Sequence, residues 1–317
     1  MGQILLALLL SAAPARPVHT YSIVARDPDS GQMGVAVQSH WFSVGSMVSW
    51  AEAGVGAVAT QSFVDPAYGP LGLELMRAGK AAPDALASLL AGDAQREVRQ
   101  VAMLDARGGV ATHTGAKCIS AAGGQTGPTY AVQANLMERD TVWPAMARTF
   151  EAATGDLAER MLRALEAAEG EGGDIRGRQS AAILIVKAKP SGRPWADKVF
   201  DLRVEDHPDP LGELRRLVGV QRAYNHMTAG DDCTAIADWD CAEREYGAAQ
   251  ALQPRNAEMA FWHAVALAQD GTLERARPLF AKAFASDPRW RELVRRLPAV
   301  DQLPKDPKLV EAILAIR

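Results

Sequence analysis

The stretch that decides the fold runs from residue 20 to residue 39 and reads TYSIVARDPDSGQMGVAVQS. Its opening residues, 20–25, are mostly β-branched, aromatic or small, a composition typical of a strand. Residues 27–31 contain a proline, which fixes φ, and a glycine, which tolerates positive φ, so they predict a turn. Residues 33–39 then predict a returning strand. The folded part of the chain is therefore expected to begin with an antiparallel hairpin.

Strand and helix patterns alternate from this hairpin to residue 204. Hairpins lie on either side of pairs of helices, an order that favours antiparallel sheets stacked between helical layers over a doubly wound parallel sheet. The expected fold class is therefore α+β. The glycine-rich residues 121–127 predict a loop. The further expected strands are Met47–Trp50, Val55–Gln61, Gln100–Leu104, Val110–Thr114, Tyr130–Leu136, Ser180–Val186 and Phe200–Val204, and the expected helices are two within Pro66–Ala91, then Val142–Thr154 and Leu157–Gly170.

The composition is that of a folded protein of about two domains. The chain has 317 residues, of which 48% are hydrophobic and 23% charged, and its formal net charge is -4. A single core stops growing beyond about 250–300 residues, so two domains are expected. This composition excludes wholesale disorder and a disulfide-dense mini-protein. The balanced charge argues against a nucleic-acid partner, because nucleic-acid binding usually needs a stripe of basic residues on the protein surface.

The chain becomes helical and alanine-rich after residues 206–210, where two prolines interrupt any helix. Pro254 and Pro288 are 34 residues apart, and small and aromatic residues recur at the same offset. This period is the signature of tetratricopeptide repeats, and an ordinary alanine-rich helical bundle is the alternative. Residues 291–317 would then form the capping helices. The other matching pairs are Gly230 and Ala264, Ala242 and Ala276, Tyr246 and Phe280, and Ala249 and Ala283.

These patterns divide the chain into four segments. Residues 1–19 are expected to be a signal or pro-segment, and residues 20–206 a sandwich of two sheets with helices. Residues 207–221 are expected to form a linker helix, and residues 222–317 an all-α, tetratricopeptide-like helical domain.

The first segment has the pattern of a signal peptide. Ile4–Ala13 is an apolar run too short to span a bilayer, and Ala13-Pro14-Ala15 offers a cleavage site with small residues. No Lys or Arg precedes Arg16, which departs from the usual pattern. We expect export to the periplasm or beyond, with a cytoplasmic location as the alternative. No other stretch predicts a transmembrane helix.

The cysteines and histidines give no reason to expect a metal or a cofactor. The three cysteines form no CxxC pair, the six histidines form no HxH or HExxH motif, and the chain has neither a Walker loop nor a GxSxG elbow. Cys118 is expected to be buried. Cys233 and Cys241 are expected to be free thiols. A disulfide is the alternative, in an oxidising periplasm and with Cα atoms within about 7 Å of each other.

Thr20 stands at the start of the first strand, directly after the segment expected to be removed. A hydroxyl is a weak nucleophile and needs an adjacent base. A newly exposed α-amine titrates near pH 7.7–8.0 and can take the proton from the hydroxyl of its own residue. An N-terminal Thr20 would thus carry both nucleophile and base. The alternative is that Thr20 merely begins a strand, where threonine is common.

Six motifs between residues 20 and 182 carry a resemblance to a known family that covers about residues 20–217. They are Thr20–Asp27, Gly34–Val37, Trp50–Gln61, Tyr68–Pro70, Tyr130–Asn135 and Gly177–Ala182. Together they resemble the bacterial DUF1028 family. The resemblance implies the N-terminal nucleophile (Ntn) hydrolase superfamily and an αββα sandwich. It also implies that Thr20 matches the threonine at which family members typically begin. It points to a hydrolase fold and not to one particular reaction.

The chain departs from the family at its expected cleavage site. A cut after Ala15 leaves residues 16–19 ahead of Thr20, and His19 is a poor residue immediately before a signal-peptidase cut. Three outcomes remain open. The bond between His19 and Thr20 is cleaved autocatalytically, a second protease trims the end, or Thr20 stays blocked and the fold is inactive.

Other candidate site residues follow from chemical type and position. Asn135 and Gln133 are expected to donate hydrogen bonds to a tetrahedral oxyanion, although buried amides also commonly satisfy backbone groups. Ser39 and His40 end the second strand, beside the expected place of Thr20 in the hairpin. His40 is a candidate for proton transfer, while a lone histidine is more often structural.

The expected substrate-binding residues follow a glycine-rich loop. Arg178 is a candidate for binding a substrate carboxylate in a bidentate fork, and a structural ion pair is the alternative. Gln179 and Ser180 adjoin it and are included in the same expected site.

The predicted function is therefore that of an exported amidohydrolase, which cleaves amide bonds of a small molecule or peptide through Thr20 and needs no cofactor. The alternative is a catalytically silent binding domain joined to a tetratricopeptide module that recruits a protein partner. A homo-oligomer is compatible with either prediction.

Overall fold

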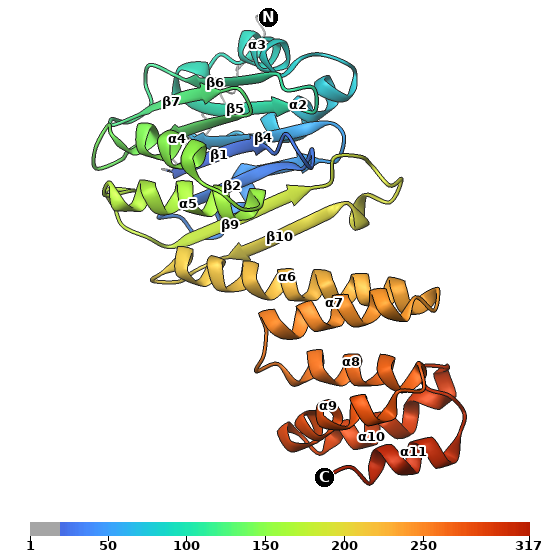
Figure 1. Cartoon of the computed structure of the whole chain (residues 1–317). Helices are drawn as coiled ribbons and strands as arrows, with labels where there is room; N and C mark the ends of the chain where they lie inside the picture. Colours follow the sequence, from blue (N-terminus) through green and yellow to red (C-terminus); the bar gives the residue numbers. More distant parts are fainter. Residues whose placement is uncertain (1–19) are drawn as a thin grey trace, which may run out of the picture. The chain divides into compact units, whose positions relative to one another are not determined.

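The predicted hairpin opens the described part of the protein. The computed structural model describes residues 20–317, so the expected signal or pro-segment, residues 1–19, lies outside the described residues. β1 (Thr20–Arg26) pairs antiparallel with β2 (Met33–Ser39), which places Thr20 opposite Ser39 (Figure 1). Gly31, with φ at +69°, closes the turn between them because it lacks the Cβ that disfavours this conformation.

β1 is an interior strand of a six-stranded sheet in the order β10-β9-β2-β1-β8-β7, in which every neighbouring pair is antiparallel. A second antiparallel sheet has the order β3-β4-β5-β6. The remaining strands are β3 (Ser49–Glu52), β4 (Gly56–Ser62), β5 (Arg99–Asp105), β6 (Val110–Thr114), β7 (Gly123–Gly127), β8 (Tyr130–Ala134), β9 (Ser180–Val186) and β10 (Lys198–Val204).

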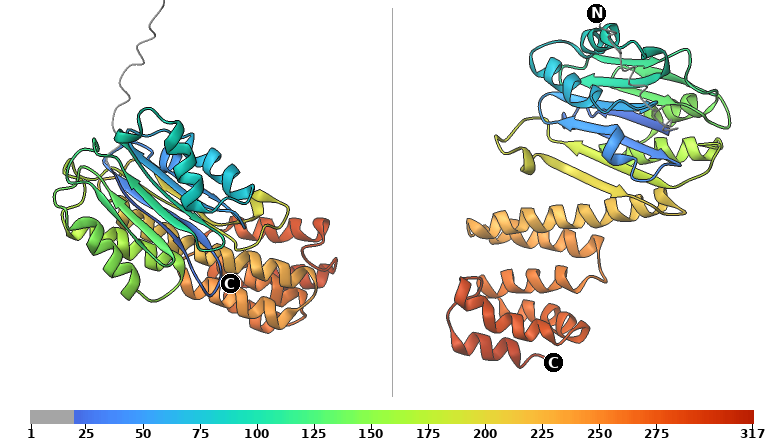
Figure 2. Two further views of the ribbon diagram at one scale, coloured as in Figure 1. Left: turned by 90° about the horizontal axis from the view of Figure 1, so that it is seen from above. Right: turned by 180° about the vertical axis from the view of Figure 1, so that it is seen from behind.

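The two sheets face each other, and helices cover their outer faces (Figures 1 and 2). α2 (Tyr68–Arg77) and α3 (Ala82–Gly92) pack on the four-stranded sheet, whereas α4 (Val142–Ala152) and α5 (Leu157–Gly170) pack on the six-stranded sheet. Buried aliphatic side chains of both sheets, such as Val24 of β1, fill the space between them. This arrangement confirms an α+β fold built on two antiparallel sheets with helices.

Two local expectations are wrong. Residues 121–127, expected as a loop, include β7, which forms an edge of the six-stranded sheet. The glycines have a steric role there, because a Cβ on Gly123 would lie 2.5 Å from the Trp143 ring. Residues 47–50, expected as a strand, are divided between a short helix, α1 (Gly45–Val48), and β3. A short apolar run fits a helical turn as well as a strand, so its pattern alone cannot separate them.

The chain divides into two compact units between Arg215 and Arg216, within α6 (Pro210–Ala235). The second unit, residues 216–317, is all-helical, which confirms the expected helical C-terminal segment. None of the helices in residues 20–317 is both long and apolar enough to cross a membrane. The further helices are α7 (Trp239–Leu252), α8 (Ala257–Gln269), α9 (Leu273–Ser286), α10 (Arg289–Arg296) and α11 (Pro307–Leu314).

The 34-residue period corresponds to buried packing positions in this unit. Gly230 of α6 must be small, since a Cβ there would lie 2.7 Å from the Tyr246 ring of α7. The assignment to tetratricopeptide repeats stays a prediction. The buried residues at this offset are Ala242, Tyr246 and Ala249 on α7 and Ala276, Phe280 and Ala283 on α9.

A disulfide joins Cys233 and Cys241, so the expectation of two free thiols is wrong. The tight connection between α6 and α7 brings their Cα atoms to 5.8 Å. Asp238 fixes the start of α7, because its side chain accepts a hydrogen bond of 3.1 Å from the backbone N–H of Cys241. Sequence spacing showed that the two cysteines were close, but not how sharply the chain turns between them.

Candidate functional site

Thr20 lies on the side of β1 that faces the four-stranded sheet. Side chains alternate along a strand. Ser22 points across to β4, where its hydroxyl donates a 2.6 Å hydrogen bond to Oε1 of Gln61. Tyr21 points the other way and donates a 2.6 Å hydrogen bond to Glu169 of α5. Thr20, two residues from Ser22, therefore shares the space between the sheets, where it is fully buried.

The Thr20 hydroxyl and carbonyl are both held by neutral polar groups. Oγ1 of Thr20 donates a 3.1 Å hydrogen bond to Oγ of Ser39, its register partner on β2. The Thr20 carbonyl accepts hydrogen bonds from Nε2 of Gln61 at 3.0 Å and from the backbone N–H and Nδ2 of Asn135 at 3.1 and 3.4 Å. The structure thus brings together three residues singled out in the sequence, Thr20, Ser39 and Asn135.

Gln100 of β5 links these groups into one network. Its Oε1 accepts hydrogen bonds from Nε2 of Gln61 at 2.7 Å and from Nδ2 of Asn135 at 2.9 Å. Its Nε2 donates to the carbonyl of Ala134 at 2.8 Å and to the Thr114 hydroxyl at 2.9 Å. We call Thr20, Ser39, Gln61, Gln100 and Asn135 the Thr20 cluster. All of its members are buried, so its amide and hydroxyl groups act in an environment of low polarity.

Sequence reasoning missed Gln61 and Gln100 as site residues. Each is an amide side chain at the polar end of a strand with an apolar middle, and this is the signal that could have found them. A polar side chain buried in a sheet costs stability unless it is hydrogen-bonded, so such a residue indicates a partner across the sandwich.

Gln133 lies on β8, opposite Ser22 of β1 in the six-stranded sheet. Its Nε2 donates hydrogen bonds to the carbonyl of Ala59 at 3.1 Å and to the Ser22 hydroxyl at 3.3 Å, while its Oε1 accepts one from Thr112 at 3.3 Å. These bonds tie the two sheets together. Its described contacts therefore satisfy backbone and hydroxyl groups.

The backbone is in the left-handed region at two positions beside the Thr20 cluster. Ser62, which follows Gln61, has φ at +69°, and Leu136, which follows Asn135, has φ at +55°. Non-glycine residues rarely adopt this conformation, and such strain collects at functional sites, where the surrounding structure holds it in place. Both residues turn the chain directly after an amide donor of the cluster.

His40 follows Ser39 but packs against a different loop. Its backbone N–H donates a 3.0 Å hydrogen bond to Asp174, which pairs with Arg176 at 2.7 Å. Within residues 20–317, Nδ1 of His40 is buried and has no hydrogen-bond partner. The ring lies beside the loop that precedes β9, because a Cβ on Gly177 would lie 3.7 Å from this nitrogen.

Arg178 is placed away from the Thr20 side chain. It forms an ion pair of 2.5 Å with Glu169, the residue that also accepts the Tyr21 hydroxyl on the helix-covered side of β1. A second carboxylate, that of Asp209, lies 3.9 Å away. This is the ionic arrangement that the alternative interpretation of Arg178 describes, and its side chain is about half exposed.

Gln179 and Ser180 connect β9 to β2. The backbone N–H of Gln179 donates a 3.2 Å hydrogen bond to the Ser39 carbonyl, and Ser180 lies opposite Ser39 in the register. The Ser180 hydroxyl donates to the carbonyl of Trp41 and accepts a 3.1 Å hydrogen bond from the N–H of Val44. Both residues hold the end of β2 that carries Ser39.

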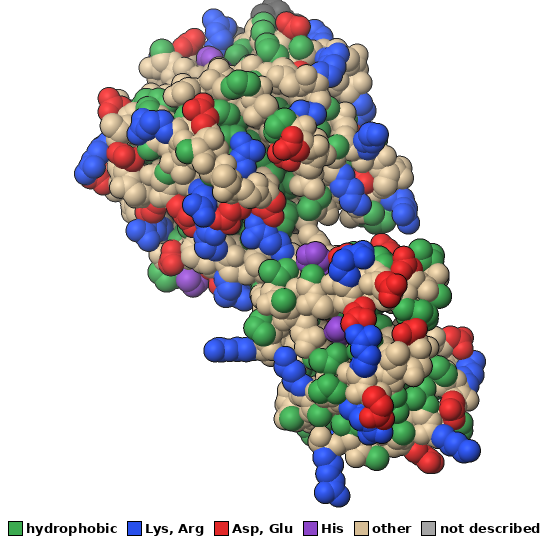
Figure 3. Space-filling view, in the orientation of Figure 1, with side chains coloured by type: hydrophobic (Ala, Val, Ile, Leu, Met, Phe, Trp, Pro, Cys, Tyr) green, Lys and Arg blue, Asp and Glu red, His purple; other side chains and the backbone are tan. Residues whose placement is uncertain are grey.

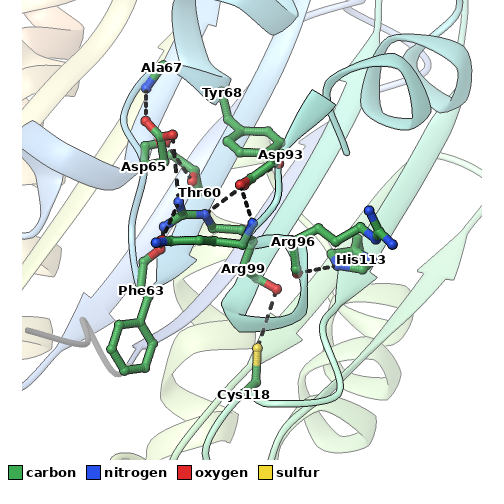
Figure 4. A network of polar contacts seen from close by, with 11 residues as sticks. Thr60, Phe63, Asp65, Ala67, Tyr68, Asp93, Arg96, Arg99, His113 and Cys118 are labelled. Carbon is green, nitrogen blue, oxygen red and sulfur yellow. Dashed lines mark hydrogen bonds and ion pairs between the residues drawn. The ribbon is translucent and has the colours of Figure 1, made fainter. Parts of the chain in front are cut away.

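Arg99, the residue before Gln100 on β5, belongs to an ionic network beside the Thr20 cluster (Figure 4). Arg99 donates a 2.8 Å hydrogen bond to Asp93 and a 2.5 Å hydrogen bond to the carbonyl of Phe63, which ties β5 to the loop after β4. Burial alone would raise the pKa of the Asp93 carboxyl, but hydrogen bonds from Arg99 and Tyr68 lower it below its ordinary value. The network therefore keeps Asp93 charged and the loop fixed.

Cys118 lies at the edge of the same network. Its thiol donates a 3.3 Å hydrogen bond to the carbonyl of Arg99, and burial raises the pKa of this thiol. Cys118 is partly buried, which agrees only in part with the expected buried side chain. The protonated thiol is a poor nucleophile at neutral pH. No group of three or more His, Cys, Asp or Glu side chains in the described part of the chain is arranged to hold a metal ion.

Comparison with known proteins identifies a family and a similar solved structure. Residues 20–214 match the model of a family described as "Family of unknown function (DUF1028)". The crystal structure of protein SPO2555 from Silicibacter pomeroyi, which carries the same family label, is 30% identical to this chain with a TM-score of 0.57. The alignment covers 71% of this chain and 94% of that one. Among curated proteins, none matches. The chain therefore belongs to the DUF1028 family.

Proposed function

We propose that this protein is an N-terminal-nucleophile amidohydrolase in which Thr20 attacks the amide carbonyl of a small molecule or peptide. The observation that carries the proposal is the place of Thr20. It is the first residue of an interior strand, its hydroxyl is oriented by Ser39, and amide donors of Gln61 and Asn135 converge on it.

The first step needs the α-amine that removal of residues 1–19 would expose. The Oγ1–H bond of Thr20 breaks, its proton moves to the α-amine, and Oγ1 forms a bond to the substrate carbonyl carbon. Every contact named above for Oγ1 and the Thr20 carbonyl comes from a neutral group. Thr20 is also fully buried, and burial favours the neutral form of an amine, which is the form that accepts a proton.

The negative charge that develops on the carbonyl oxygen needs hydrogen-bond donors. Nδ2 of Asn135 is well placed, since its bond to the Thr20 carbonyl is the longest of the three at 3.4 Å and is the easiest to exchange. Gln100 holds this amide from the other side at 2.9 Å. Asn135 is therefore proposed as the oxyanion donor and Gln100 as its positioning residue.

The second half of the reaction releases the acyl group. The C–N bond breaks as the α-ammonium returns its proton to the leaving amine, and an ester to Thr20 remains. Water then attacks this ester, the α-amine takes a proton from the water, and Oγ1 recovers it as the acid leaves. All bonds and protons in these steps are accounted for without a cofactor.

We further propose that the chain is exported before it matures. The Cys233–Cys241 disulfide supports this proposal, because disulfides persist in oxidising compartments. Reduced cysteines in protein isolated from its native host would argue for the cytoplasmic alternative.

The proposal is tested on the mature protein by intact mass, N-terminal sequencing and a β-lactone probe. We expect a chain that begins at Thr20 and is labelled there. Labelling should vanish in Thr20→Ala, persist in Thr20→Ser, and be unaffected by Thr126→Ala, which changes an exposed threonine of β7. A mature chain that starts at residue 16 and is never trimmed, or labelling that survives Thr20→Ala, would refute the proposal.

A binding domain without catalysis is the second candidate function. It is favoured by the complete burial of Thr20 and by the ion pair that already occupies Arg178. In that case a Thr20→Ala protein would keep full biological activity, and the helical unit would recruit a protein partner. Covalent labelling at Thr20 excludes this candidate.

A further inference from the structure

The helical unit contains a pocket with a volume of about 950 Å³. Its wall is formed by α6, α7 and α8 and by the segment between α10 and α11. Four aromatic side chains line it: Tyr224, Trp239, Tyr246 and Trp262. A volume near 1,000 Å³ lies at the upper end of the range for ligand sites, so the pocket has room for more than one side chain.

Two carboxylates in the pocket are held by tyrosines. The Tyr246 hydroxyl donates a 2.6 Å hydrogen bond to Asp231, and the Tyr224 hydroxyl donates a 2.6 Å hydrogen bond to Glu258. Burial and the hydrogen bond to Asp231 raise the pKa of Tyr246, and the hydrogen bond to Glu258 and burial raise the pKa of Tyr224, so both hydroxyls stay protonated donors at neutral pH. A carboxylate has further lone pairs after accepting one hydrogen bond.

The charge of the pocket is negative. Its lining includes Asp231, Glu258, Asp301 and Lys305 as the charged residues. Lys305 pairs with Asp301 at 2.8 Å, and these two charges offset each other. Asp231 and Glu258 are left facing an aromatic wall without a basic partner among the lining residues.

Aromatic rings and carboxylates without a basic partner in the lining together suit a cationic group that belongs to a larger molecule. Aromatic faces attract ammonium and guanidinium groups through the ring quadrupole, and carboxylates bind the same groups through charge-assisted hydrogen bonds. We infer that this pocket binds a peptide segment through an Arg or Lys side chain, which Trp239 and Trp262 stack against and Asp231 and Glu258 pair with.

The test measures binding of two peptides to the full-length protein by titration calorimetry. The first is acetyl-Ala-Ala-Arg-Ala-Ala-amide, and the second carries citrulline, a neutral isostere, in place of arginine. We expect the citrulline peptide to bind about tenfold more weakly or worse, since it loses the charge. Equal affinity for both peptides, or no binding of the arginine peptide at millimolar concentration, would overturn the inference.

Variants locate the site. Glu258→Gln and Asp231→Asn keep an oxygen that accepts the tyrosine hydroxyl, so they should fold while lowering affinity about tenfold each. Glu274→Gln serves as the control, because it removes a carboxylate that is 80% exposed on α9 and is not in the pocket lining. An equal loss of affinity in Glu274→Gln would show a general charge effect and overturn the assignment.

Two further titrations test the choice of a peptide as ligand and the independence of this pocket from Thr20. Free agmatine carries the guanidinium without a peptide, and if it binds as tightly as the arginine peptide, the commitment to a peptide is wrong. All titrations are repeated in Thr20→Ala protein. The pocket should bind there unchanged, so failure of the proposed hydrolase activity and failure of this site are distinguishable.

Discussion

Gln100 is the residue on which the geometry of the Thr20 cluster depends. One oxygen accepts two amide donors, and one nitrogen satisfies a strand carbonyl and a hydroxyl. A buried network of this kind is rigid because each member is satisfied only in one arrangement. The residue therefore fixes the side-chain amide of Asn135.

Replacing Gln100 by leucine should destabilise the protein by about 2–4 kcal/mol, because the amide donors of Gln61 and Asn135 lose their shared acceptor. Urea unfolding measures the change. Gln125→Leu is the matched control on the exposed edge strand β7 and should stay within about 0.5 kcal/mol of the wild type. Equal losses in both variants would contradict this role of Gln100.

Asp93 should make stability depend on pH. Burial alone would raise its pKa, but hydrogen bonds from Arg99 and Tyr68 lower it below the ordinary value of 3.8. A depressed pKa contributes stability above about pH 4, which is lost as the pH falls through the folded pKa. The difference in unfolding free energy between wild type and Asp93→Asn should therefore shrink below about pH 4.

Unfolding curves of wild type and Asp93→Asn at several pH values measure this difference. Asp206→Asn, which changes an exposed carboxylate before α6, should give a difference that does not vary in the same range. A gap for Asp93→Asn that is constant down to about pH 2 would contradict the ionic role of Asp93.

The sequence allowed part of the site to be predicted. Thr20 and Ser39 follow from the hairpin, because its turn sets the register that pairs them. Gln61 and Gln100 join the Thr20 cluster from the other sheet. A polar residue in a strand indicates that it has a partner, but no local pattern identifies that partner. The ion pair of Arg178 likewise depends on where α5 lies, which is a tertiary property.

At the scale of elements, apolar strands and long helices were predictable because periodicity reports burial. β7 was not predicted, since its three glycines suggest a turn, whereas in the sheet a Cβ on any of them would lie within about 3 Å of a neighbouring atom, such as the Trp143 ring at Gly123. The outer surface over α5 and the start of α6 carries interspersed acidic and basic side chains (Figure 3). Arg215 reaches Glu159 at 3.0 Å and Glu166 at 2.6 Å there.

The disulfide between α6 and α7 should stabilise the helical unit. It closes a loop with a sequence separation of 8 residues, for which chain entropy gives about 2–3 kcal/mol. Thr234, Ala235 and Trp239 lie within this loop and line the pocket of the helical unit described above. Reduction should therefore lower the unfolding midpoint of this unit and weaken binding of the arginine peptide.

Thermal unfolding and peptide titration with and without a reductant check both effects. The double variant Cys233→Ser/Cys241→Ser should already show them and should not respond to the reductant. A response of this variant would assign the effect to another group, such as Cys118.

At the scale of the whole molecule, the two compact units predict two unfolding transitions. Calorimetry should resolve one transition for residues 20–215 and another for residues 216–317, and reduction of the disulfide should move only the second. A single transition that shifts as a whole on reduction would show one cooperative core instead of separate units.

If the chain matures by a cut before Thr20, as proposed above, the place of Thr20 also sets the order of cleavage and folding. Proteases cut exposed, extended segments. The bond before Thr20 has no loop on its C-terminal side, because the strand that follows is already buried between β2 and β8. A separate protease can therefore act only before the sheet closes, whereas a folded precursor must cut itself, at a rate independent of its concentration. Under this proposal, folding ends the time in which a separate protease can cut the chain, and a folded precursor that does not cut itself would keep Thr20 blocked.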